Sequence, residues 1–338
     1  MDSSITGDGV TDDTAAIQRA IDAGGSVRLP EGVFVLTRPL ALRPGSTITG
    51  VSPTASILRQ TAPDADALSG TDVHTLRIEN LTLEGPGTGS GTGLRLVRER
   101  EPNTRYVTLQ DLYIRRFGRD GVDVSNGIVS AFTRVVAENN GRHGFYLYGV
   151  PGGAAGTSVS LIACYGNTND GTGIYLFNMA YCALNACASE GQRVNYLLQG
   201  CQGVSVVGCG AEFTAPGGDG FVVDGGFGNV LAACWNYENA GRAYVVTGGA
   251  FAITLAGIVE NSPVAGATAS LVVDEGCRAV SVVGPSYDSP LVLAPGSSTV
   301  INGGTRPVVG GSRQGNAALA ELLSALDGLG LITDVSAP

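Results

Sequence analysis

The feature that most constrains the fold is an internal repeat of about 24 residues. Short apolar stretches recur 22 to 27 residues apart along the middle of the chain. A second series of β-rich runs, each ended by a turn residue, keeps step with the first. Two or three short strands per repeat of this length make one coil of a β-solenoid, whereas propeller blades need roughly 40 to 50 residues. The first series is centred on Ala137, Cys164, Cys187, Cys209, Cys234 and Ile258, and the second spans 145–149, 174–178, 196–200, 221–225, 244–248 and 271–274.

Composition agrees with a solenoid. The chain has 51 glycines among 338 residues, and only 15% of its residues are charged. Such a composition favours many short strands joined by tight turns over a helical protein. Repeats from Ile48 to Val300 predict nine or ten coils, which at a strand spacing of about 4.8 Å form a body roughly 45 Å long. We therefore expect an all-β fold, a single-stranded parallel β-helix.

An open solenoid needs covered ends, because the terminal coils expose apolar side chains and unpaired backbone. Asp12 and Asp13 predict an N-cap and a first-turn acid, and the pattern predicts a capping helix over about 13–23 that ends at Gly24-Gly25. We expect three regions: an N-terminal cap over 1–47, the β-helix over 48–304 and a C-terminal segment over 305–338. Leucines at 319, 322, 323 and 326 follow helical spacing, so that segment either caps the last coil or mediates oligomerisation.

Charge and hydropathy exclude some classes of function. Twenty basic residues, all Arg, face 30 acidic ones, for a net charge of -10. This balance argues against a nucleic-acid partner, and the absence of Lys excludes a lysine base or Schiff base. No apolar run is long enough to span a bilayer, so we expect no membrane insertion. The start Met1-Asp2-Ser3-Ser4 lacks the basic and apolar regions of a secretory signal, which favours release by another route or a trimmed chain.

The cysteines offer two interpretations. Seven is an odd number spread through a long chain, so we expect free thiols rather than a disulfide framework. Cys164, Cys187, Cys209 and Cys234 could suggest zinc, but one cysteine per coil places the first about 14 Å from the last. Four thiolates around one zinc ion each lie about 2.3 Å from it. We therefore expect a ladder of thiols in the core, no metal site and no cofactor.

Two segments carry a family resemblance. Residues 7–18 (GDGVTDDTAAIQ), followed by 25–32 (GSVRLPEG), resemble the opening of the pectate-lyase-like superfamily, which includes bacteriophage tailspikes and capsule depolymerases. Residues 316–334 are similar to C-termini of phage virion proteins. The resemblance implies a right-handed β-helix in a homotrimer with parallel axes, and it carries little information about substrate.

A motif around His143 is similar to the Gly-His-Gly motif of polygalacturonase-like β-helices. Residues 140–144 read Asn-Gly-Arg-His-Gly, but the Arg-Ile-Lys of those enzymes cannot occur in a chain without Lys, and we find no tight Asp cluster in the coils. A structural turn histidine is the alternative. If the motif is functional, Arg142 and His143 contact the substrate.

The most informative column lies three residues beyond each member of the first series. Glu190 and Glu212 should lie one coil apart, close to the carboxyl separation of about 5 Å in retaining glycosidases, and are the candidate catalytic pair. Tyr165, Trp235 and Tyr237 would flank them as platforms for sugar rings, with Arg193 meeting acidic groups of a charged polysaccharide. The alternative is that a column of turns gathers polar residues by chance. The column reads Asn140, Asn167, Glu190, Glu212, Tyr237 and Asn261.

These observations predict a virion spike or fibre that binds a bacterial surface polysaccharide, alongside other virion proteins. The expected location is the virion, on a particle assembled in the bacterial cytoplasm, because a virion protein needs no secretory signal. Whether the spike also degrades the polysaccharide stays open, and hydrolysis by the Glu pair is favoured over a lyase reaction. The alternatives are a free polysaccharide hydrolase or lyase and a purely structural virion decoration.

Overall fold

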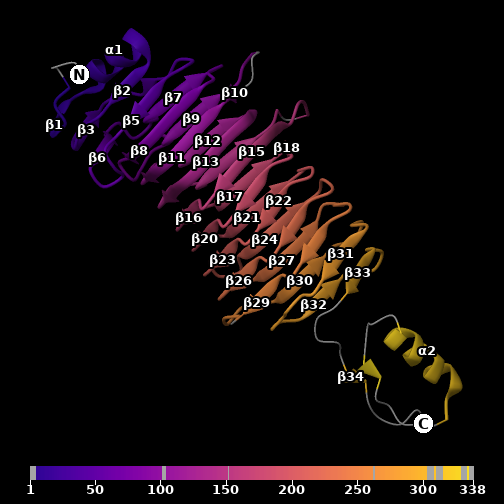
Figure 1. Cartoon of the computed structure of the whole chain (residues 1–338). Helices are drawn as coiled ribbons and strands as arrows, with labels where there is room; N and C mark the ends of the chain where they lie inside the picture. Colours follow the sequence, from indigo (N-terminus) through magenta and orange to yellow (C-terminus); the bar gives the residue numbers. More distant parts are fainter. Residues whose placement is uncertain are drawn as a thin grey trace.

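The computed structural model describes residues 5–100, 104–150, 152–261, 263–302, 308–309, 315–328 and 333–334. They form one elongated stack of coils that runs from the N-terminal helix to β33, with the helix α2 beyond its far end (Figure 1). All strand pairs are parallel, and each strand pairs with its counterparts in the preceding and following coils. The fold is the predicted right-handed parallel β-helix with a helix at its N-terminus and a short helix near its C-terminus.

The strands of the described residues form two large sheets and one small pair. The 22-stranded sheet contains β1 (Asp8–Asp12), β2 (Ser26–Arg28), β3 (Gly32–Leu36), β5 (Thr47–Thr49), β6 (Ser56–Gln60), β8 (Leu76–Glu84), β10 (Thr104–Arg105), β11 (Val107–Arg115), β13 (Gly127–Glu138), β15 (Gly156–Ile162), β16 (Tyr165–Asn167), β18 (Met179–Ala180), β19 (Ala183–Asn185), β20 (Ala188–Glu190), β22 (Ser205–Val207), β23 (Gly210–Glu212), β25 (Val230–Ala232), β26 (Trp235–Tyr237), β28 (Thr254–Ala256), β29 (Val259–Asn261), β31 (Val280–Val283) and β33 (Thr299–Asn302). The 11-stranded sheet contains β4 (Leu40–Ala41), β7 (Leu68–Thr71), β9 (Leu94–Val97), β12 (Val122–Ser125), β14 (Phe145–Tyr148), β17 (Thr172–Phe177), β21 (Val194–Gln199), β24 (Asp219–Asp224), β27 (Arg242–Thr247), β30 (Ala269–Val273) and β32 (Leu291–Leu293). The small pair is β34 (Val308–Val309) with β35 (Thr333–Asp334).

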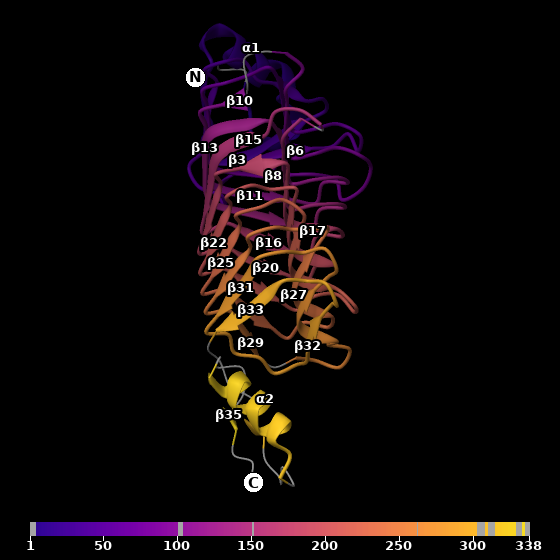
Figure 2. The same cartoon turned by 90° about the vertical axis from the view of Figure 1, so that its right-hand side faces the viewer.

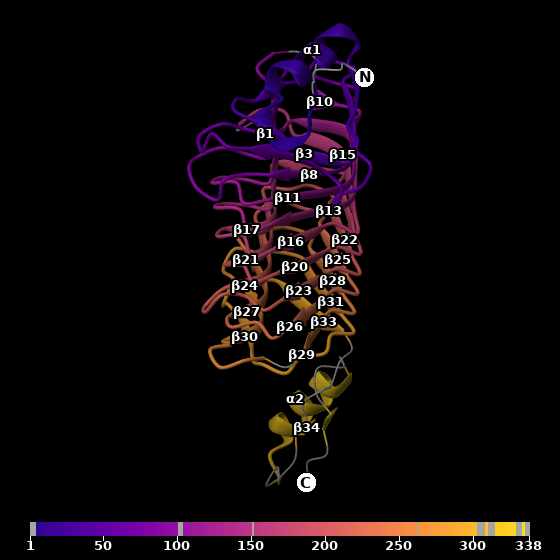
Figure 3. The same ribbon diagram turned by 90° about the vertical axis from the view of Figure 1, so that its left-hand side faces the viewer.

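The 22-stranded sheet is folded into two faces by a column of residues in the left-handed conformation. Between β19 and β20, for example, Ala186 has a φ of 51° and turns the chain through a corner. The same corner is made by Arg134, Ala163, Gly208, Ala233 and Gly257 in other coils. With the 11-stranded sheet, each coil therefore presents three faces, which stand side by side in Figure 3.

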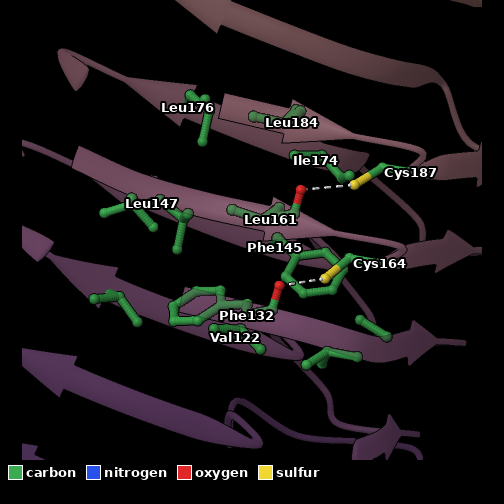
Figure 4. Packing of buried hydrophobic residues seen from close by; sticks show 14 of the residues in the cluster. Val122, Phe132, Phe145, Leu147, Leu161, Cys164, Ile174, Leu176, Leu184 and Cys187 are labelled. Atoms are coloured by element: carbon green, nitrogen blue, oxygen red, sulfur yellow. Dashed lines mark hydrogen bonds between the residues drawn. The ribbon is translucent and has the colours of Figure 1, made fainter. Parts of the chain in front are cut away.

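The interior is a continuous apolar core filled by ladders of like residues. Tyr196, Phe221 and Tyr244 stack on consecutive coils with ring centroids 4.5 and 5.2 Å apart, and all three are fully buried. The cysteines form a second ladder, as predicted. Cys164 and Cys187 donate to the carbonyl oxygens of Phe132 and Leu161 in the preceding coil (Figure 4). All seven cysteines are buried and free.

The N-terminal helix α1 (Thr14–Gly24) closes the first coil with its apolar side, through the buried residues Ala16, Ile17 and Ile21. Gly25 ends it in the left-handed conformation with a φ of 73°. The predicted capping differs in detail. Both acids precede the helix, Asp12 accepts from the backbone N–H of Thr14, and Asp13 is buried and accepts from the N–H groups of residues 6 and 7. The closed first loop therefore uses Asp13, because its two donors lie in the preceding segment.

The C-terminal helix α2 (Ala317–Gly328) lies beyond the last coil in both Figure 1 and Figure 2. Its main contacts among the described residues are with β35. Leu319 and Leu322 are exposed, and Leu323 is buried. None of the described helices is long and apolar enough to cross a membrane.

Candidate functional site

The outward residues of β16, β20, β23, β26 and β29 form what we call the glutamate face, which occupies the middle of Figure 3. Each of these strands has three residues whose middle side chain points inward. The third residues pair as Asn167, Glu190, Glu212, Tyr237 and Asn261. The predicted column is therefore present from Asn167 onward, and Glu190 and Glu212 lie on adjacent strands.

The register predicted for the coil before Asn167 is wrong. Val136 pairs with Tyr165 and Glu138 pairs with Asn167, so Glu138 continues the column in place of Asn140. Asn140 is buried and bonded to Asn169. The sequence misled because Ala137 and Cys164 are both small and inward, while the offset between the paired residues of these coils is 29 rather than 27.

The first residues of the same strands set the relief of the glutamate face. Tyr165 and Trp235 stand three strand spacings apart, about 14 Å, with only Ala188 and Gly210 between them. The Oε1 of Glu212 lies about where it would touch a β-carbon on Gly210, 3.5 Å away, so the carboxylate leans over bare backbone. Two aromatic side chains thus bound a strip of small residues that is flanked by Glu190 and Glu212.

The aromatic end of this strip is well exposed. Trp235 is 41% exposed and lies 5.0 Å from Tyr237, centroid to centroid. Phe213 meets Tyr237 edge-on at 5.6 Å. These rings form a tilted group on which a sugar ring could stack.

The two glutamates differ in their surroundings. The Tyr165 hydroxyl donates to Glu190, which therefore has a partner that favours its ionised form. Burial, and then the charge of Glu190, raise the pKa of Glu212. An acid and a base could divide their roles in this way, with Glu212 as the proton donor.

The predicted basic residues are not all on this face. Arg193 is exposed in the turn that follows β20, and it forms no ion pair with any described carboxylate. Arg142 and His143 directly precede β14 and face the 11-stranded sheet, where Arg142 makes a two-pronged contact with Asp120. The structure thus brings together Tyr165, Glu190, Glu212, Trp235 and Tyr237, and it separates Arg142 and His143 from them.

The 11-stranded sheet holds a second cluster that the sequence interpretation missed. Asp120 and Asp123 lie together beside His143, which corrects the statement that the coils hold no tight Asp cluster. The signal was available, because Asp-Gly-Val-Asp at 120–123 is followed 23 residues later by the His-Gly-Phe-Tyr of 143–146 in the same register. Among the described residues, no group of three or more His, Cys, Asp or Glu side chains is arranged to hold a metal ion.

A hollow of about 630 Å³ lies at the N-terminal end, between α1 and β2. Its lining includes Arg19 and Arg28 but no carboxylate, histidine or aromatic residue. It therefore lacks both an acid–base pair and a stacking platform, and the glutamate face is the better candidate.

Two family models match the chain. One, described as rhamnogalacturonase A/epimerase, pectate lyase-like, matches residues 1–75, and one described as a right handed beta helix region matches residues 101–258. The preneck appendage protein of Bacillus phage PZA is 29% identical over 117 residues, which are 32% of this chain and 14% of that protein. The chain thus spans about a seventh of that relative.

Solved structures share the fold. The enzymatically active domain of bacteriophage CBA120 tailspike protein 2 superposes with a TM-score of 0.70 at 15% identity, over 84% of this chain and 50% of that one. The mannuronan C-5 epimerase AlgE4 A-module of Azotobacter vinelandii gives 0.66 at 17% identity, over 88% of this chain and 94% of that module. At these identities the likeness concerns the fold.

Proposed function

Since the chain is a right-handed parallel β-helix of the pectate-lyase-like superfamily, we propose that it is a virion spike that binds a bacterial surface polysaccharide through its glutamate face. Relatives and structural neighbours that include phage appendage and tailspike proteins support the virion role and location. Fold alone says nothing of function, so the weight rests on the site.

One observation carries the binding proposal. Trp235, Tyr237 and Phe213 are grouped at one end of a strip of small residues, with Tyr165 at the other end and two carboxylates alongside. The strip of about 14 Å suits two or three sugar residues, since stacking rings hold the apolar sides of sugars while carboxylates accept from their hydroxyl groups. Arg193 is free to meet an acidic substituent.

The test is binding of the purified protein to immobilised bacterial surface polysaccharides. We expect Trp235→Ala to weaken binding at least tenfold without unfolding the chain, because the ring is 41% exposed. Phe251→Ala is the matched control, since Phe251 is similarly exposed, at 47%, on another part of the coil. Equal losses in both variants, or none in either, would remove the glutamate face as the site. Binding to no polysaccharide would favour a structural decoration.

We also propose that Glu212 and Glu190 hydrolyse the bound glycan, as acid and as nucleophile or base. Their adjacent strands and the raised pKa of Glu212, caused by burial and by Glu190, support this assignment. Glu190→Gln and Glu212→Gln should abolish the release of new reducing ends and leave binding largely intact. A wild type that binds but releases none would be an adhesin. A free enzyme is the alternative, and virion fractionation separates it from a spike.

Finally, we propose a homotrimer with parallel axes. Beside the glutamate face, the outward positions of β15, β19, β22, β25, β28, β31 and their corners carry no charge, although about a quarter or more of an ordinary surface is charged. A flat, uncharged face lets copies of an acidic chain approach each other without repulsion. Light scattering should return three times the 34.3 kDa chain mass, and a mass near one chain at micromolar concentration would contradict the trimer. The positions are Ser160, Ile162, Ala163, Ala183, Asn185, Ala186, Ser205, Val207, Gly208, Val230, Ala232, Ala233, Thr254, Ala256, Gly257, Ser281, Val283 and Gly284.

A further inference from the structure

A column of unusual composition crosses the 11-stranded sheet near its N-terminal end. Arg95 on β9, Asp123 on β12, Tyr146 on β14 and Tyr175 on β17 occupy paired positions on four successive strands. With the side chains packed beside them, these residues form what we call the tyrosine face. It is distinct from the glutamate face, which lies on the other large sheet.

Half-buried aromatic rings form the platform of this face. Tyr146 is central, with its ring centroid 4.5 Å from that of Tyr148, 4.9 Å from that of Tyr175 and 5.5 Å from that of His143. The guanidinium of Arg142 lies 5.1 Å from the centre of the Tyr146 ring. The platform is therefore large enough for a sugar ring and has a cation at one edge.

His143 is a neutral hydrogen-bond donor in this site. Its Nδ1 accepts from the backbone N–H of Thr172 at 3.0 Å, so the ring proton belongs on Nε2. Burial lowers the pKa of His143 to about 4, which keeps the ring neutral at physiological pH. The Nε2–H can therefore donate to a ligand hydroxyl group.

Charge at the tyrosine face is positive in excess. Three guanidiniums surround two buried carboxylates: Arg142 holds Asp120, Arg119 lies 3.4 Å from Asp120 and 3.6 Å from Asp123, and Arg95 lies 3.9 Å from Asp123. The side chains of the arginines are each about a third or more exposed, whereas both aspartates are inaccessible. A local cationic site on a chain of net charge -10 favours an anionic ligand.

Asp123 is the unsatisfied member of the cluster. Both of its carboxylate oxygens, and Nε of Arg95 facing them, are buried without a hydrogen-bond partner among the described residues. Buried polar groups normally have partners, and an unpartnered carboxylate costs stability. Asp123 therefore acts as a poorly fitted counter-ion for Arg95 and Arg119, which a better anion could replace.

We propose that the tyrosine face binds a carboxylate-bearing sugar, whose ring lies against Tyr146 and Tyr175 and whose carboxylate replaces Asp123 as the counter-ion of Arg95 and Arg119. The site does not require binding at Trp235, so it extends the proposed function without resting on it. A uronic acid presents this combination of a ring face and a planar anion, and a guanidinium is the side chain that matches a carboxylate geometrically.

Binding at this site is coupled to uptake of a proton by Asp123. Burial, and then the nearby Asp120, already raise the pKa of Asp123 to about 6 in the free protein. A ligand carboxylate adds a further negative charge and takes up the guanidiniums, so the pKa of Asp123 rises further. The other groups that face Asp123 do not titrate here, since His143 is neutral, Tyr148 has its pKa raised to about 12 by burial, and the arginines stay charged. Affinity therefore falls by up to tenfold per pH unit above pH 6.

The experiment is calorimetry with a tetrasaccharide of glucuronic acid and with its methyl ester, at pH 6 and pH 8. We expect the acid form to bind the wild type at least tenfold tighter at pH 6, and the ester to bind weakly at both. Asp123→Asn should bind the acid form at pH 8 as tightly as the wild type does at pH 6. Asp224→Asn is the matched control, because Asp224 lies on the same sheet, bonded to Gln199, away from the arginines.

Trp235→Ala separates this site from the glutamate face, since it should leave binding of the tetrasaccharide unchanged. Comparing buffers of different ionisation enthalpy measures proton uptake on the wild type alone, and it should approach one proton per ligand at pH 7 to 8. Equal affinity for acid and ester, weaker binding by Asp123→Asn, absence of binding or absence of proton uptake would each overturn the proposal.

Discussion

The left-handed corners predict a change of stability whose sign depends on three residues of sequence. Ala163, Ala186 and Ala233 stand at the same corner with φ near 50°, all exposed. Replacing alanine by glycine at such a φ stabilises by about 1 kcal/mol per site, because an L side chain is strained there. The methyl groups contribute little packing, since a β-carbon added at the equivalent Gly208 or Gly257 meets nothing within 4 Å. The triple variant should gain about 3 kcal/mol.

The matched control uses the same change on flat strand. Ala183, Ala232 and Ala256 lie on β19, β25 and β28, where the backbone is extended, and glycine there should cost about 0.5–1 kcal/mol per site. Urea unfolding, followed by the fluorescence of Trp235, measures both. With a denaturant slope of about 3 kcal/mol/M, the corner variant should raise the midpoint by about 1 M and the control should lower it. A corner variant that falls in parallel with its control would refute the corner geometry.

Three further predictions test the packing. Glu84 receives Arg59 and Arg115 at 2.7 and 2.6 Å, and although burial alone would raise its pKa, these contacts lower it; Glu84→Gln should cost about 1–3 kcal/mol at pH 7, a difference that is lost as pH falls below about 4.5. All seven thiols should resist a thiol reagent in the native protein and react in urea, because each is buried; fast reaction of any one would contradict the ladder. Phe221→Leu removes two stacked contacts and should cost at least about 1–3 kcal/mol, whereas the exposed Phe227→Leu should stay within about 0.5 kcal/mol, as thermal unfolding can measure.

The fold could be predicted because a solenoid writes its period into the sequence. Inward residues such as Cys187 and Cys209 must match in size from coil to coil, so their spacing reveals the register, and with it the adjacency of Glu190 and Glu212. The same reasoning failed between Ala137 and Cys164, where a longer coil hid the offset of 29 residues. Small inward residues in two positions of one strand cannot be distinguished by spacing alone.

The tyrosine face was missed for a different reason. Tyr146 and Tyr175 look like ordinary strand residues, because aromatic residues favour strands whether or not they bind anything. Their meaning depends on Asp123, whose missing hydrogen bonds appear only when its neighbours are placed. Likewise, the sequence assigned Arg142 to the glutamate face because it lies near the column in sequence, whereas Asp120 holds it at the opposite side of the turn.

The central claim, that polysaccharide binds across Trp235, can be tested with that residue as its own probe, because it is the only tryptophan in the chain. The side chain is partly exposed in the free protein, so a bound glycan that stacks on it should shift its emission to shorter wavelength in a saturable way. The midpoint of that shift should equal the dissociation constant measured by calorimetry with the same polysaccharide. Binding seen by calorimetry with unchanged emission from Trp235 would place the polysaccharide elsewhere and contradict the claim.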